Sequence, residues 1–418
     1  MKRVWIGMFL SVLLITAWAM VTTDKRSEAT GVEIQYVAEA KAEQPPQKTW
    51  VGSWAASPQY PSAEATEGVS NQTVRMIVRP HLNGDRVRIR LSNTFGERPV
   101  TFEEGYIADV LDGATTVPSS QRQLRFNGRK SITLAAGQSI MSDPVRFAVS
   151  REQDVAISLY VKGESGPITW HRLAKQASYI SEEGNFSTDH RSDPFIRRTY
   201  SWYWITGLDV LAPTDTVGIV CMGDSITDGA GSTSGANARY PDFLSQRLQA
   251  EGLSWGVMNA GISGNKILRD DPVYGPKALD RFQRDVLDQS GVTHVILLEG
   301  INDIGHTPGE RNPDAIISGM RQMITQAHDR GLKIYGGTLT PYGGADYYTE
   351  EGNLVRRQVN HWIRTSGEFD GVIDFDAALR DPERPNRMLP VYDSGDHLHP
   401  SDAGYRRMAE EVNLQLFQ

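Results

Sequence analysis

Hydrophobic and polar residues alternate with a period of two in the first half of the chain, a pattern typical of strands with one buried face. The alternation covers residues 74–78, 87–91 and 155–161. The pair Asn83-Gly84 lies between the first two runs and predicts a hairpin, because both residues accept positive φ. Short strands separated by Gly, Pro, Asn and Asp predict a β-sandwich accessory domain over residues 49–211.

The pattern changes after Val217, where short apolar runs alternate with amphipathic segments of helical period. Strands that alternate with helices form parallel βαβ units, so we expect an α/β domain of three layers over residues 212–418. Ligands bind such sheets at the carboxyl ends of the strands. The predicted strands are Val217–Met222, Trp255–Met258, His294–Leu298, Lys333–Tyr335 and Val372–Phe375.

The N-terminus has the pattern of a targeting segment. Lys2 and Arg3 precede an apolar stretch over residues 4–21, as in a secretory signal. Residues 1–22 are therefore interpreted as a signal peptide or a membrane anchor, and the sequence leaves the choice open. Residues 23–48 are polar and predict a linker. We expect a secreted or extracytoplasmic protein.

Composition narrows the choice of partners. The formal net charge is −8, which argues against nucleic acid, because phosphate binding needs clustered Lys and Arg. The arginines at 86, 88 and 90 predict a solvated strand face. Cys221 is the chain's one cysteine, so no intramolecular disulfide can form, and its apolar neighbours predict a buried residue.

Three segments that follow predicted strands carry candidate chemistry. Ser225 lies in GDSITDG, where a serine at a strand-to-helix turn is exposed to the crevice. The alternative is a simple Gly/Asp/Ser turn. Gly264 can present its backbone N–H to an anion, although most Gly-rich loops are only turns. Asn302 can direct its amide at an oxyanion or can cap a helix.

A fourth segment, Asp396-His397-Leu398-His399-Pro400, precedes the last predicted helix. A catalytic base needs a partner that fixes its tautomer, and the spacing of three favours His399 over His397 as the partner of Asp396. These residues offer no complete set of metal ligands, so no metal is expected.

Together the four segments resemble the SGNH (GDSL-type) hydrolases, which are named for Ser, Gly, Asn and His in four blocks. Ser225, Gly264, Asn302 and the pair Asp396 with His399 match these blocks in order. The whole chain is similar to a bacterial subgroup with an N-terminal β-domain, which resembles a xylanase-associated arylesterase or acylhydrolase. Its motifs SNTFG and GIND begin at Ser92 and Gly300.

The resemblance implies a flavodoxin-like domain and a serine esterase that needs no cofactor. Its implied triad is Ser225, His399 and Asp396, and its implied oxyanion hole is Ser225, Gly264 and Asn302. The substrate is expected to be a small-molecule or polysaccharide ester. Two alternatives remain, an O-acyltransferase on envelope polysaccharide and a carbohydrate-binding protein with a vestigial site.

Overall fold

The computed structural model describes residues 47–151 and 153–417. The expected signal segment and nearly all of the expected linker lie outside the described residues. Among the helices that are described, none is long and apolar enough to cross a membrane.

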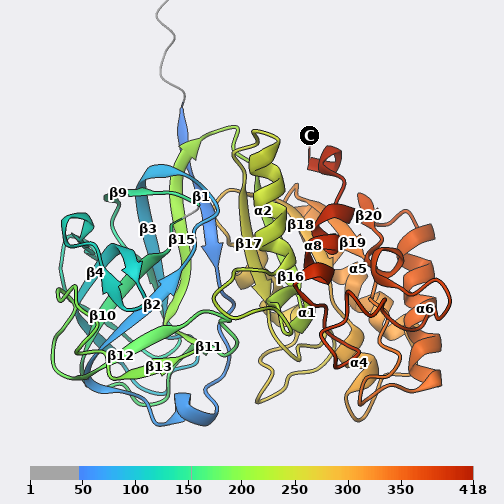
Figure 1. The fold of residues 1–418 in the computed structure, drawn as a ribbon, viewed down its shortest axis with the longest axis horizontal. Helices are drawn as coiled ribbons and strands as arrows, with labels where there is room; N and C mark the ends of the chain where they lie inside the picture. Colours follow the sequence, from blue (N-terminus) through green and yellow to red (C-terminus); the bar gives the residue numbers. More distant parts are fainter. Residues whose placement is uncertain (1–46, 152, 418) are drawn as a thin grey trace, which may run out of the picture. The chain divides into compact units, whose positions relative to one another are not determined.

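The first half of the described chain forms two large antiparallel sheets (Figure 1). One has the order β1-β15-β3-β8, with β9 also on β3. The other has the order β13-β12-β2-β10-β4-β5, with β6 and β7 also on β4. The strands of the first sheet are β1 (Lys48–Ala55), β3 (Gly84–Ser92), β8 (Ser139–Met141), β9 (Val145–Val149) and β15 (Ile205–Pro213). Those of the second are β2 (Ser70–Val78), β4 (Val100–Asp112), β5 (Thr115–Thr116), β6 (Arg122–Gln123), β7 (Ile132–Leu134), β10 (Val155–Glu164), β12 (Ser178–Glu183) and β13 (Arg197–Thr199).

The hairpin predicted at Asn83-Gly84 is wrong. Strand β2 pairs with β10 and β12, whereas β3 pairs with β15, β8 and β9 in the other sheet. Neither Asn83 nor Gly84 adopts the positive φ that a tight hairpin turn needs. The apolar faces of both strands are buried in one hydrophobic cluster, so the chain crosses from one sheet to the other here.

The second half contains a sheet of five parallel strands in the order β17-β16-β18-β19-β20. All five predicted apolar runs contain strands, although the last ends at Ile373, and Phe375, predicted as strand, begins a helix. The order of the strands is that of flavodoxin-like doubly wound sheets. The strands are β16 (Gly218–Gly223), β17 (Gly256–Gly261), β18 (Val292–Leu298), β19 (Lys333–Gly337) and β20 (Gly371–Ile373).

Helices flank this sheet (Figure 1), and α2 packs against α8 while α5 packs against α6. Ser401 caps α8 by accepting a hydrogen bond from the Gly404 N–H, as its position in the sequence predicts. The helices are α1 (Ser225–Asp228), α2 (Tyr240–Ala250), α3 (Ala278–Phe282), α4 (Ile301–Gly305), α5 (Pro313–Asp329), α6 (Glu350–Thr365), α7 (Phe375–Leu379) and α8 (Asp402–Glu411).

The antiparallel and parallel parts touch where β1 packs against β17. Gly256 permits this contact, because a Cβ atom at that position would lie 2.2 Å from the carbonyl oxygen of Gly52. The solvated arginine face predicted for β3 is wrong for two of its members. Arg88 donates to Asp209 and Ser290, and Arg90 donates to Gln289, so these side chains bridge the two parts.

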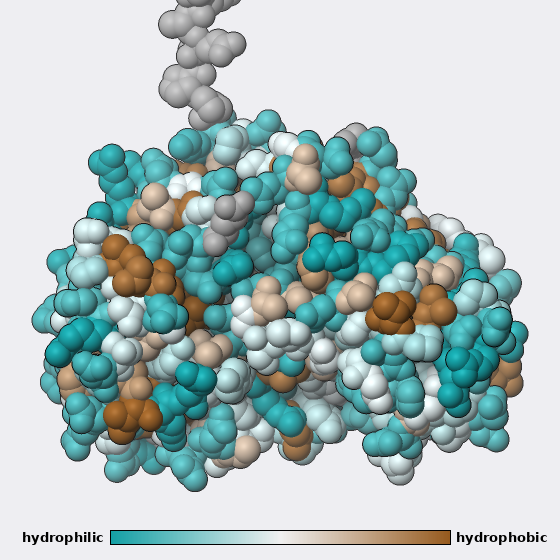
Figure 2. Space-filling model, viewed as in Figure 1, coloured by the Kyte–Doolittle hydropathy of each residue, from teal (hydrophilic) through white to brown (hydrophobic). Residues whose placement is uncertain are grey.

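The face of the molecule in Figure 2 is largely hydrophilic, with hydrophobic residues in small separate groups. Exposed large apolar residues such as Leu111, Ile196 and Val391 come from distant parts of the sequence. Cys221 is fully buried in β16, as predicted, and burial raises the pKa of its thiol to about 12.

Candidate active site

Ser225 follows β16 directly and is the first residue of the short helix α1. Asp224 caps this helix, because its Oδ1 atom accepts a hydrogen bond of 2.9 Å from the Ile226 N–H. The Ser225 N–H is at the first helical position and so has no acceptor within the helix. The turn therefore holds the Ser225 hydroxyl and backbone N–H at the carboxyl end of the sheet's central strands.

The loop before α8 brings His399 and Asp396 to this serine. The Nε2 atom of His399 lies 2.8 Å from the Ser225 Oγ, and its Nδ1 atom lies 2.6 Å from the Asp396 Oδ2. Because the carboxylate accepts the Nδ1–H proton, Nε2 of the neutral ring accepts from the serine hydroxyl. A hydrogen-bonded chain of this kind activates a hydroxyl for nucleophilic attack.

The carboxylate of Asp396 is fixed by its own loop. Its Oδ1 atom accepts the backbone N–H groups of Leu398 and His399 at 3.0 and 2.8 Å. Desolvation raises the pKa of Asp396, but the hydrogen bonds from the His399 ring and from these two N–H groups outweigh it and hold the pKa well below its usual range. Asp396 therefore stays ionised opposite the imidazole.

His397 has a different partner. Its Nδ1 atom lies 2.6 Å from the Asp393 Oδ2, so its ring is paired with a carboxylate other than that of Asp396. A cavity of about 220 Å³ is lined by both Ser225 and His399, but not by His397.

Gly264 and Asn302 line the same cavity as Ser225. Gly264 has a φ of 82°, and a Cβ atom there would lie 2.2 Å from the Tyr274 ring, so only glycine fits. The Gly264 N–H has no hydrogen-bond acceptor among the described residues. One amide hydrogen of Asn302 donates to the Asn265 carbonyl at 3.0 Å, which leaves the second free for an oxyanion.

Tyr347 supports Asn302, and no motif in the sequence singles out this tyrosine. Its hydroxyl donates to the Asn302 Oδ1 at 3.2 Å, which fixes the orientation of the amide. Desolvation raises the pKa of Tyr347 well above its usual range, so the hydroxyl remains a donor. The His306 ring contacts the rings of both Tyr274 and Tyr347, and the three side chains form an aromatic wall of the cavity.

A buried ionic cluster lies beneath the serine. Arg281 is fully buried and donates to the carbonyls of Ala260 and Gly223 at 2.7 and 2.9 Å. Its guanidinium lies 3.6 Å from the Glu299 carboxyl, whose oxygen atoms have no hydrogen-bond partner among the described residues. Desolvation raises the pKa of Glu299 well above its usual range and that of Asp303 to about 6.

The antiparallel part also reaches the site. Arg172 and Leu173 follow β11 (Trp170–His171) and line the cavity beside Ser225. The adjacent His171 lies 2.9 Å from Asp228, the last residue of α1. Asp228 accepts the Ser263 N–H at 2.9 Å, so it braces the turn, as its position beside the serine predicts.

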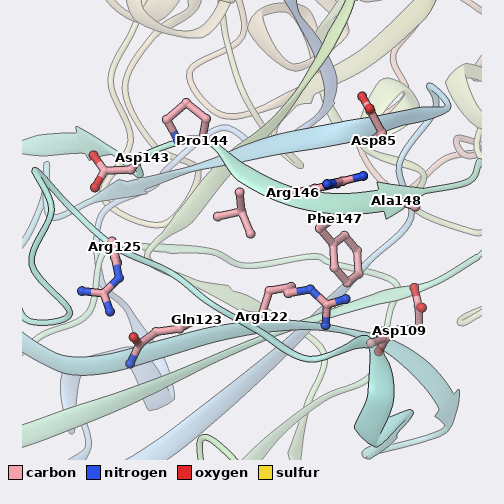
Figure 3. Close-up of a pocket in the computed structure, with 12 residues that line it drawn as sticks. Asp85, Asp109, Arg122, Gln123, Arg125, Asp143, Pro144, Arg146, Phe147 and Ala148 are labelled. Carbon is pink, nitrogen blue, oxygen red and sulfur yellow. Dashed lines mark hydrogen bonds between the residues drawn. The ribbon is translucent and has the colours of Figure 1, made fainter. Parts of the chain in front are cut away.

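A larger cavity of about 650 Å³ lies in the antiparallel part (Figure 3). Three arginines and three aspartates line it, and it contains none of the residues that the motifs single out. Its charged lining residues are Arg122, Arg125, Arg146, Asp85, Asp109 and Asp143. In the described part of the chain, no three His, Cys, Asp or Glu side chains are placed to hold a metal ion.

Comparison with known proteins gives a family for the parallel part of the chain. Residues 221–407 match the model of the GDSL-like lipase/acylhydrolase family, and this part of the chain belongs to that family of hydrolases. No curated protein matches the chain.

Solved structures similar to the chain each cover slightly less than half of it. A GDSL-like lipase from Bacteroides thetaiotaomicron is 20% identical, with a TM-score of 0.38, over 48% of this chain and 87% of its own. An aryl esterase from M. smegmatis is 18% identical, with a TM-score of 0.38, over 46% of this chain and 95% of its own. A carbohydrate acetylesterase from Sinorhizobium meliloti is 16% identical, with a TM-score of 0.37, over 46% of this chain and 95% of its own.

Proposed function

We propose that the chain is an exported serine esterase that hydrolyses short-chain acyl or acetyl esters of small molecules or polysaccharides. The observation that carries this proposal is the 2.8 Å contact between the Ser225 Oγ and the His399 Nε2, with Asp396 on the other ring nitrogen. The matched family consists of lipases and acylhydrolases, which cleave esters.

In the first step, the Ser225 Oγ attacks the ester carbonyl carbon while its proton passes to the His399 Nε2. Asp396, held ionised by its loop, stabilises the imidazolium that results. The carbonyl oxygen becomes an oxyanion as the new C–O bond forms. We assign its stabilisation to the N–H groups of Ser225 and Gly264 and to the Asn302 amide.

The tetrahedral intermediate collapses when the alcohol leaves and takes the proton from His399. A water molecule then attacks the acyl-serine, gives a proton to His399 and releases the carboxylic acid. Ser225 recovers its proton, so the cycle balances without a redox step, and no cofactor is required.

The cavity supports a short acyl group. Its volume of about 220 Å³ is below the range of roughly 300–1,000 Å³ that pockets for drug-sized ligands occupy. The wall of Tyr274, His306 and Tyr347 limits it further. Export rests on the charged and apolar segment at residues 1–22. We also propose that residues 49–211 form a β-sandwich accessory domain beside a three-layer domain at residues 212–418.

Purified protein should be assayed with aryl esters of increasing acyl length and with acetylated oligosaccharides, each with and without EDTA. The proposal expects acetyl or other short-chain esters to turn over fastest, with the rate unchanged by EDTA. Transfer of the acyl group to an added sugar in preference to water would favour the O-acyltransferase. Carbohydrate binding without turnover of any ester would favour the vestigial site, and loss of activity with EDTA would contradict serine chemistry.

A further inference from the structure

We propose that His171, which the N-terminal β-part contributes, is a positioning residue of the active site and holds the Gly264 loop in place through Asp228. This inference rests on the proposed function, because it concerns the donors of the proposed oxyanion hole.

His171 is buried between two hydrogen-bond acceptors. Its Nδ1 atom lies 2.9 Å from the Ser57 carbonyl oxygen, and its Nε2 atom lies 2.9 Å from the Asp228 Oδ1. Its side chain is 4% exposed, and the ring packs against Trp202 with a centroid separation of 5.4 Å. A neutral imidazole donates through one nitrogen only, so full satisfaction of both contacts requires a proton on each nitrogen. The arrangement is therefore an ion pair with Asp228.

Asp228 connects this histidine to the oxyanion loop. Its Oδ2 atom accepts the Ser263 N–H at 2.9 Å and the Ser263 hydroxyl at 2.6 Å. Ser263 immediately precedes Gly264, so the hydrogen bonds fix the peptide unit next to the proposed donor. Asp228 also ends the helix that begins with Ser225. One carboxylate thus links the segments that carry two of the three proposed oxyanion donors.

Further contacts keep the Asp228 segment in place. Its backbone carbonyl accepts from the Arg239 Nε at 3.1 Å, and the Arg239 guanidinium also donates to the Ala174 carbonyl in the β-part. Desolvation by burial lowers the pKa of His171, and the nearby charge of Arg239 lowers it further. Direct contact with Asp228 and the Ser57 carbonyl outweighs both effects and raises the pKa above its usual value.

The chain provides a matched control at the same contact between the antiparallel and parallel parts. His81 is also buried, with its Nδ1 atom 2.7 Å from the Val257 carbonyl and its Nε2 atom 3.1 Å from the Asp242 Oδ1. Asp242 belongs to α2 and also accepts from Arg239 at 2.9 and 3.2 Å, but neither His81 nor Asp242 bonds to Asp228 or lines the cavity at Ser225. Loss of His81 should therefore weaken the contact between the antiparallel and parallel parts without moving the loop that carries Gly264.

The variants to compare are His171→Leu, His171→Gln, Ser263→Ala and the control His81→Leu. Gln at position 171 can still donate to Asp228 and should rescue part of the loss. Each variant is assayed for kcat and KM with a short aryl ester, and for inhibition by a boronic acid. A boronic acid forms a tetrahedral adduct on the serine, so it reports the oxyanion geometry that a purely structural role would not affect.

We expect His171→Leu to lower kcat about tenfold and to leave KM within about twofold of the wild-type value. The loss in kcat is smaller than the roughly 100-fold or greater loss that follows removal of a whole oxyanion donor. Boronic acid affinity should fall by a similar factor, whereas His81→Leu should leave both values within about twofold. Unchanged kcat and boronic acid affinity in folded His171→Leu would overturn the inference. If that variant does not fold, folded His171→Gln decides: a smaller loss in both values supports the inference, and values equal to those of the wild type in both His171→Gln and Ser263→Ala refute it.

The assay also separates this inference from the proposed function. If the wild-type protein has no ester turnover that depends on Ser225, the proposed function fails. If that turnover is present and the His171 and Ser263 variants behave as wild type, only the positioning role fails.

Discussion

The Nε2 atom of His399 lies 2.8 Å from the Oγ atom of Ser225, whereas His397, two positions earlier, forms its own pair with Asp393 at 2.6 Å. Adjacent segments of one loop thus hold two separate His–Asp pairs. Only the pair of His399 with Asp396 reaches the serine, although His397 is the histidine adjacent to Asp396 in the sequence.

His399→Ala should lower kcat by about 10⁴-fold or more, because the members of a triad act as a unit. His397→Ala should cost less than about tenfold, because its ring pairs with Asp393 and does not line the cavity at Ser225. Both variants can be measured on one aryl acetate after circular dichroism has shown that they fold. The reverse ranking would transfer the role of the base to His397 and require a new partner in place of Asp396.

Tyr347→Phe removes one hydroxyl, which donates to the Asn302 Oδ1 at 3.2 Å. One hydrogen bond has a net value of about 1 kcal/mol, so we expect kcat to fall about fivefold with little change in KM. Tyr348→Phe is the control, because that hydroxyl accepts from Asn386 and does not line the cavity. Equal kcat values for the two variants would show that Tyr347 does not orient the amide.

Arg281→Met should destabilise the fold by about 3–5 kcal/mol, the usual effect of breaking a buried ion pair from one side. The variant would leave the carboxyls of Asp285 and Glu299 without this cation and would remove donors to the carbonyls of Ala260 and Gly223. Urea unfolding followed by tryptophan fluorescence measures the change. Arg321→Met, which removes an exposed ion pair with Glu368, should cost no more than about 1 kcal/mol. A similar small cost at Arg281 would contradict a structural role for the cluster.

The pH dependence of stability should show the ion pair at His171. Desolvation lowers the pKa of His171, but Asp228 and the Ser57 carbonyl together raise it above its usual value. A raised pKa stabilises the fold below the unfolded value of about 6.5, and this contribution is lost as pH rises through the folded pKa. The difference in unfolding free energy between wild type and His171→Gln should therefore shrink as pH increases. A difference that stays constant from about pH 5 to about pH 9 would mean that His171 does not titrate as the pair requires.

The sequence predicted the parallel sheet well, because buried parallel strands are continuous apolar runs between helices. It placed the four motif segments at strand ends and helix starts, where the structure brings them together. It failed at Asn83-Gly84, because a local turn signal does not reveal that β2 and β3 belong to different sheets.

Support from distant residues could not be predicted from the sequence. His171 is 57 positions from Asp228, and Tyr347 is 45 positions from Asn302. Such contacts depend on the tertiary packing of separate elements, and no characteristic spacing of residues in the sequence reveals them. The arginines of β3 are a second example. Arg88 and Arg90 alternate with apolar residues as solvated residues do, but they form hydrogen bonds to Ser290 and Gln289 in the parallel part.

The most direct test of the account is covalent labelling of Ser225. An aryl or alkyl fluorophosphonate should modify the wild-type protein once, and peptide mass spectrometry should place the adduct on Ser225, with loss of ester turnover in proportion. Ser225→Ala should fold normally, escape the label and lose on the order of 10⁴-fold or more in kcat. Labelling at another residue, or turnover that survives in folded Ser225→Ala, would contradict the account.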